Sequence, residues 1–213
     1  MAELKPGVIG TISGKIGNVV ASNWRDIKYL RGVAATSSKT ATEAQLTQRA
    51  KFTLLFDFLS SFAGAIDLGY KYQYQGRSTA FNLAMSTNMH VIGGTLAALS
   101  VDYPSVVISK GRLLPAADTD ASSKEPGVVD VSWQNLDVAT DQGLSDKAVV
   151  IVYNPVKKLA IYSTDGAVRG DLKLAMHVPD SFSGDEVHVY LFFSGVAVRK
   201  NSQSMYVGSV SVF

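Results

Sequence analysis

The chain has 213 residues, of which 46% are hydrophobic and 18% charged, so it is long and apolar enough to bury a core. It contains no cysteine, which excludes disulfides, thiolate catalysis and iron–sulfur clusters. Residues 1–115 carry 12 Lys/Arg against 6 Asp/Glu, whereas residues 116–213 carry 8 against 12. This asymmetry indicates an anionic partner for the first half or contact between copies, and a chance scatter of charges over two solvated surfaces explains it equally well.

The amino-terminal residues do not form the apolar segment of a signal peptide, because glycines interrupt them repeatedly. The longest apolar runs, such as residues 148–153, are the length of a strand and too short to span a bilayer. We therefore expect no signal peptide and no membrane insertion. The expected location is the cytoplasm, or a virion or other particle.

Residues 6–31 place short apolar pieces between glycines, which predicts a glycine-rich β arm with tight turns. Residues 10–15 do not form a phosphate loop, because three residues rather than four separate the glycines and Ile16 replaces the required Ser/Thr. Cations near Trp24 and Tyr29 form a pattern that binds nucleic acid or another acidic surface, although exposed cations around two packed aromatic residues give the same pattern. The candidate anion contacts are Lys15, Arg25, Lys28 and Arg31.

Thr40 to Glu43 form a capping-box signature, which predicts a helix running to about Ala63. Its first turns are amphipathic, but from Phe52 onward apolar side chains face nearly every direction. A helix that is apolar on every side must be covered on every side, so we expect burial against the β-domain or another subunit. The predicted oligomer interface comprises Phe52, Leu55, Phe56, Phe58, Leu59 and Phe62, together with Trp24 and Tyr29.

Shorter elements are predicted after this helix. The tyrosines of residues 70–74 alternate with polar residues, and this period of two predicts a strand with one aromatic face. Residues 78–79 cap a second helix, predicted over residues 80–90. Residues 91–104 are predicted to form a loop and residues 106–108 a short strand.

The polar stretch 115–127 predicts a linker between an N-terminal region, residues 1–114, and a C-terminal β-domain, residues 128–213. The β-domain has six or seven strand-sized segments, and its apolar run 148–153 is typical of a strand covered on both faces. With Trp133 on an early strand, this pattern predicts an immunoglobulin or fibronectin-III-like sandwich. The predicted fold class is α+β, mainly β, with this sandwich preceded by the glycine-rich β arm and two helices.

Histidines are the candidate bases for any catalytic or metal centre. His177 and His188 lie on predicted strands that can pair, with Asp180 and Asp185 close in sequence, as a metal site or a hydrolase would need. Solvent-facing strand histidines are much commoner, and His90 has no second ligand nearby in sequence. We therefore expect no catalytic residue, no metal site and no cofactor.

Eight short motifs follow one another along nearly the whole chain. They are Gly14-Lys15-Ile16-Gly17, Trp24…Tyr29…Arg31, Gln48-Arg49-x-x-Phe52, Ser109-x-Gly111-x-Leu113, Val131-x-Trp133, Val152-Tyr153-Asn154, Gly184-Asp185-x-Val187-His188-x-Tyr190 and Ser202-x-Ser204-x-Tyr206-x-Gly208. This ordered set resembles an uncharacterised family of proteins from Bacteroidota. The resemblance implies the fold described above and no assigned activity. The glycine-rich basic opening also resembles that of phage structural proteins.

The favoured hypothesis is a non-enzymatic structural or assembly protein, a homo-oligomer that forms a multi-copy particle or filament such as a virion. The alternative is a carbohydrate- or surface-binding β-sandwich module. Its stacking platform would be Tyr70, Tyr72 and Tyr74, or the region of Tyr190 and Tyr206. The third hypothesis is a hydrolase or nuclease whose active site is built from the histidines and nearby acids.

Overall fold

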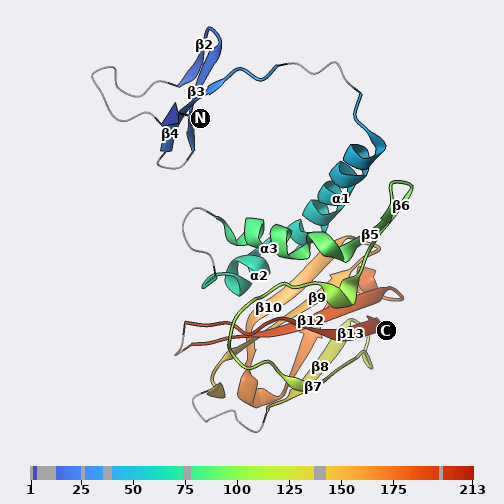
Figure 1. Cartoon of the computed structure of the whole chain (residues 1–213). Coiled ribbons are helices and arrows are strands. Elements are labelled where there is room, and N and C mark those ends of the chain that lie inside the picture. The colour runs from blue at the N-terminus through green and yellow to red at the C-terminus, as the bar shows by residue number, and fades with distance from the viewer. Residues whose placement is uncertain are drawn as a thin grey trace. The chain divides into compact units, whose positions relative to one another are not determined.

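The computed structural model describes residues 2–3, 13–24, 27–35, 40–73, 78–136, 143–196 and 199–213 (Figure 1). The chain divides into two compact units, Met1–Ala41 and Thr42–Phe213. This division lies far upstream of the linker predicted at residues 115–127. In the described part of the chain no single helix is long and apolar enough to cross a membrane, although one bent pair of helices passes on length and composition.

The first unit is an antiparallel sheet, which we call the N-terminal sheet. Its strands are β1 (Ala2–Glu3), β2 (Gly14–Ile16), β3 (Val19–Trp24) and β4 (Ile27–Gly32), in the order β1-β4-β3-β2. Gly17, in the turn between β2 and β3, has a φ of 58°, which costs glycine little because it has no Cβ. The predicted glycine-rich β arm is confirmed for residues 14–24 and 27–32, and residues 4–12 and 25–26 lie outside the described residues.

The second unit opens with the helices α1 (Glu43–Ser60), α2 (Ala63–Gly69) and α3 (Ala80–Asn88). Helix α1 is capped two residues later than predicted. The Thr42 hydroxyl accepts a hydrogen bond from the Gln45 backbone N–H at 3.3 Å, and the Gln45 side chain accepts one from the Thr42 N–H at 3.1 Å. The predicted single helix is broken, because α1 and α2 meet at 84°. Thr79 caps α3, as predicted.

The predicted immunoglobulin or fibronectin-III-like sandwich is confirmed, and it consists of two antiparallel sheets. One sheet has the order β10-β9-β12-β13, with β9 (Lys147–Asn154), β10 (Leu159–Val168), β12 (Glu186–Ser194) and β13 (Met205–Ser211). The other has the order β11-β8-β7, with β7 (Ala117–Ser122), β8 (Val128–Gln134) and β11 (Lys173–His177). Strand β7 lies within the predicted linker, so the sandwich begins earlier than residue 128.

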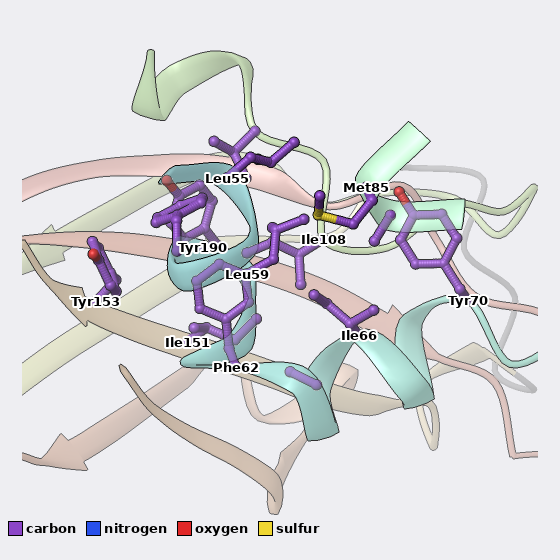
Figure 2. Close-up of a cluster of buried hydrophobic side chains, with 14 of the residues drawn as sticks. Leu55, Leu59, Phe62, Ile66, Tyr70, Met85, Ile108, Ile151, Tyr153 and Tyr190 are labelled. Carbon is purple, nitrogen blue, oxygen red and sulfur yellow. The ribbon is translucent and has the colours of Figure 1, made fainter. Parts of the chain in front are cut away.

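Strands β9 and β12 are covered on both faces, as the apolar run 148–153 predicts. On one face Val150, Val152 and their neighbours pack against Trp133 in the core between the two sheets. On the other face Ile151 and Tyr190 belong to a second core that the helices close (Figure 2). The second unit therefore has three layers: helices, the four-stranded sheet and the three-stranded sheet (Figure 1).

The strand predicted at residues 70–74 does not form over its described part. Residues 71–73 are a turn after α2, and Tyr74 lies outside the described residues. The ring of Tyr70 is buried among the helices, and its hydroxyl donates to the Val107 carbonyl at 3.1 Å. Packing of this ring outweighs the local alternation of tyrosine and polar residues, because burial contributes more than strand propensity does.

The segment between α3 and the sandwich also differs from its prediction. Residues 91–104 include a hairpin of β5 (Ile92–Thr95) and β6 (Ala98–Val101) instead of a loop. Residues 106–108 are not a strand, because the backbone of Val107 bonds to the side chain of Asn88 at 2.7 and 2.8 Å. Short 3-10 turns complete the unit at Met89–Val91, Tyr103–Ser105, Arg169–Asp171 and Asp180–Phe182.

Candidate assembly interface

Four of the apolar side chains predicted for an oligomer interface lie in the core of their own chain. They are Leu55, Phe58, Leu59 and Phe62. The ring of Phe58 packs edge-on against Phe62 at 5.0 Å and against Tyr153 of β9 at 4.9 Å between centroids. All four belong to the core that the helices form with the sheet of the same unit, and Figure 2 labels Leu55, Leu59 and Phe62 among them, so their burial needs no neighbouring molecule. Of the two covers expected for this helix, the β-domain therefore buries these four residues, and their assignment to an oligomer interface is corrected.

Phe52 and Phe56 remain 51% and 47% exposed on the outer side of α1. Together with Phe81, Met85 and Met89 they line a cavity of about 360 Å³, which we call the helical groove. Phe56 and Phe81 meet edge-on at 5.4 Å between centroids. Fully covering one such side chain stabilises by roughly 1.5–3 kcal/mol, so the groove is a favourable surface for an apolar partner.

Sequence reasoning identified only the α1 wall of this groove. The opposite wall is formed from α3 and the turn after it, at a spacing of four residues: 81, 85 and 89. Side chains four residues apart lie on one side of a helix, so this spacing was the available signal.

The N-terminal sheet has one face made mainly of apolar residues. Residues directly opposite each other in antiparallel strands point to the same face. Ile16 pairs with Val19, and Ala21 pairs with Leu30, so these four share a face. Ile16 and Val19 are 60% and 40% exposed, and among the hydrophobic residues described in this sheet only Ala21 is buried. The unit therefore has almost no core of its own.

The opposite face of the N-terminal sheet combines cations with aromatic rings. Lys15 and Arg31 both pair with Val20, and the alternation of β3 and β4 places Trp24 and Tyr29 on the same side. The structure thus brings two of the four predicted anion contacts together with both predicted aromatic residues. Lys28 belongs to the apolar face through its pairing with Asn23, and Arg25 lies outside the described residues.

The histidines and acids weighed above as a metal site or hydrolase centre are not brought together. His177 is on β11 and His188 is on β12, and these strands lie in different sheets and do not pair. Asp185 instead accepts a hydrogen bond from the Asn154 side chain at 2.8 Å. No group of three or more side chains suited to a metal occurs among the described residues.

His188 has a structural role in the described chain. Its ring stacks on Tyr103 at 3.8 Å between centroids, and its Nδ1 lies 3.0 Å from the Tyr206 hydroxyl. Burial lowers the pKa of His188 below its ordinary value of 6.5, although the Glu186 carboxylate partly opposes this. The neutral ring is therefore the form that the folded chain favours.

This direction of the pKa predicts how stability depends on pH. The unfolded chain takes up a proton on His188 near pH 6.5 and the folded chain takes it up only at lower pH, so stability falls as the pH drops below about 6.5. We expect the free energy of unfolding, measured by urea titration at pH 7 and pH 5.5, to change less in His188→Gln than in the parent protein. An equal change in both proteins would contradict this account.

The tyrosines proposed as a sugar-binding platform do not form an exposed row within the described residues. Tyr70 and Tyr190 are buried, and the Tyr190 hydroxyl donates to the Tyr103 carbonyl at 3.0 Å. Tyr72 and Tyr206 are half-buried and lie on separate segments. Carbohydrate binding stays a prediction with no surface yet assigned to it.

Comparison with known proteins places the chain in a family. A family model described as "Family of unknown function (DUF6266)" matches residues 11–208. The chain belongs to this family. The DUF6266 match spans most of the N-terminal sheet and nearly all of the second unit, and it agrees with the expectation of an uncharacterised family. No curated protein matches the chain.

One solved structure that resembles this DUF6266 protein is the solution structure of the fn3 domain of human collagen alpha-1(XX) chain. It is 17% identical, covers 49% of this chain and 90% of its own, and has a TM-score of 0.34. The fibronectin-III-like fold stated above rests on the strand order of the two sheets.

Two motifs of the resemblance contact each other across the second unit. Ser109 Oγ donates to the Ser202 carbonyl at 2.7 Å and also lies 3.1 Å from the Gly69 carbonyl. The Ile108 N–H donates to Ser204 Oγ at 2.8 Å. These buried bonds tie the end of α2 to the strand-connecting segment before β13, so this pair of motifs has a structural role.

Proposed function

We propose that this protein is a non-enzymatic structural protein whose copies assemble by docking the N-terminal sheet of one molecule on a neighbouring molecule. The observation that carries the proposal is the exposure of that sheet. It presents Ile16 and Val19 on one face and Trp24 on the other, with Ala21 as its buried hydrophobic residue among those described. A sheet needs a covered apolar face to be stable, so something outside this unit must supply the cover.

Charge supports a second copy as the cover. The first unit carries six Lys/Arg and two Asp/Glu, a net charge of +4, whereas residues 42–213 carry 14 and 16, a net charge of −2. The positive first unit of one molecule is attracted to the negative second unit of the next. Repulsion between two first units, or between two second units, disfavours contacts between units of the same kind. The helical groove, with Phe52 and Phe56, offers an apolar surface on the receiving copy.

The form of the assembly follows from the same contact. A sheet of one copy that docks on the groove of the next makes a head-to-tail interface, which closes into a ring or continues as a filament. A virion or similar particle is the assembly that the resemblance to phage structural proteins suggests, with a host among Bacteroidota. The expected location is then the cytoplasm and the particle.

Sedimentation of the full chain tests the proposal. The parent protein is expected to sediment with a mass that rises with concentration above the 22.8 kDa of one chain. The variant Ile16→Asp/Val19→Asp places two charges on the apolar face of the sheet and is expected to weaken association about tenfold or more, because burying unpaired carboxylates is costly.

Val156→Asp is the matched control, because Val156 is 66% exposed in the turn between β9 and β10, far in sequence from the sheet. It should associate as the parent does. A parent protein that stays at the mass of one chain at every concentration would refute the proposal, and so would equal weakening in the control.

A further inference from the structure

Four cations from two distant segments of the second unit converge on one concavity. They are Lys110, Arg112, Arg199 and Lys200. With Tyr72, Gln73 and Gly111 they line a cavity of about 330 Å³, which we call the basic concavity. Among the described residues no acidic side chain lines it, and none forms an ion pair with any of the four cations. Gathering like charges without a counter-charge is unfavourable, and an anionic ligand relieves the repulsion.

Buried hydrogen bonds hold the floor of the basic concavity. Asn201, which follows the last cation, donates from Nδ2 to the Leu68 and Gly69 carbonyls at 2.6 and 2.9 Å. Its backbone carbonyl accepts from the Leu113 N–H at 3.0 Å. Both cation-bearing segments are thereby fixed to the end of α2, so their backbone has little conformational entropy left to lose when a ligand binds.

We propose that the basic concavity binds single-stranded nucleic acid, with phosphates against the cations and a base against Tyr72. Two of the four cations are arginines. A planar guanidinium group can donate two parallel hydrogen bonds to two oxygens of one phosphate. A single strand can stack a base on an aromatic ring beside a positive groove, and the half-buried Tyr72 keeps part of its side chain accessible. Lys71 Nζ lies over the Tyr72 ring, 5.7 Å from its centroid, so a fifth cation stands beside this aromatic residue. All lining residues of this site belong to the second unit, so the proposal does not depend on assembly through the N-terminal sheet.

Fluorescence anisotropy with a labelled oligodeoxynucleotide of about 12 nucleotides tests the site on the full chain. Arg112→Gln/Lys200→Gln is expected to weaken binding about tenfold or more. It should also lower the slope of log affinity against log salt by about 1.4, since each lost phosphate contact on a single strand removes about 0.7. Tyr72→Ala is expected to weaken binding about fivefold or more without changing that slope.

Lys124→Gln/Lys173→Gln removes the same charge from the outer face of the three-stranded sheet and serves as the control. It should bind as the parent does, and thermal melting should show all variants folded.

The proposal is wrong if the parent shows no saturable binding or if the control loses as much affinity. It is also wrong if Lys15→Gln/Arg31→Gln alone abolishes binding, which would place the site on the N-terminal sheet. A change in sedimentation of Arg112→Gln/Lys200→Gln without oligonucleotide would mark the concavity as a contact with an acidic surface of another copy.

Discussion

Gly111→Ala is expected to destabilise the second unit by roughly 3 kcal/mol or more. A Cβ at this position would lie 1.8 Å from the Asn201 carbonyl oxygen and 2.6 Å from its carbon. Both neighbours are backbone atoms. The nearby residues Leu113 and Ser202 form a parallel β-bridge, so moving one segment away from the other would break backbone hydrogen bonding. Urea denaturation of the parent and variant gives the difference directly.

Gly93→Ala is the control for this substitution. Gly93 lies in β5, and the nearest atom to a new Cβ is Ser100 Oγ at 3.9 Å, an ordinary contact. We expect a change of less than about 1 kcal/mol there. If Gly111→Ala unfolds at the same urea concentration as Gly93→Ala, the close approach of residues 111 and 201 is not present in solution.

Asp146→Ala is expected to cost about 3–5 kcal/mol, because it leaves the Arg169 guanidinium buried without its counter-charge. The two side chains are each 2% exposed, and Arg169 Nε lies 3.5 Å from Asp146 Oδ2. The guanidinium also donates to the Leu114 carbonyl at 2.7 Å and stacks on Phe193 at 3.8 Å from the ring centroid. Burial raises the pKa of Asp146, and the Arg169 charge opposes this shift.

The double variant Asp146→Leu/Arg169→Met removes both charges. It therefore separates the free energy lost with the ion pair from the cost of leaving the Arg169 charge buried and unpaired. Replacing a buried ion pair by apolar residues of similar size is often nearly neutral, so the double variant should be more stable than Asp146→Ala. Thermal or urea unfolding of the three proteins measures this order. A double variant less stable than the single one would show that the pair itself, and not the isolated charge, dominates.

Local sequence patterns predicted the main elements because those elements depend on nearby residues. The apolar run 148–153 predicted a strand covered on both faces, and β9 lies between two cores. The alternation around Trp133 likewise predicted β8. Helix α1 was predicted from its capping signature and its amphipathic first turns, although the capping residue is Thr42 and the helix ends at Ser60.

Contacts between distant segments explain most of what the sequence did not predict. Phe52 and Phe56 look the same as Phe58 in the sequence, and only the position of the sheet decides which rings are covered. Strand β7 is polar on its exposed side and lies at the edge of its sheet, where it pairs with β8 alone, so it resembled a linker. The basic concavity joins residues 110–112 to 199–200, a proximity that no local pattern encodes.

Amide hydrogen exchange in the exposed N-terminal sheet is the most direct test of assembly between copies. Amide hydrogen exchange of β3 and β4 can be followed at a dilute and a concentrated protein solution. If a second copy covers the sheet, the protection of these amides rises with concentration, whereas that of β9 in the core stays constant. Equal protection of β3 and β4 at both concentrations would contradict the account, because the cover would then be absent or come from the same chain.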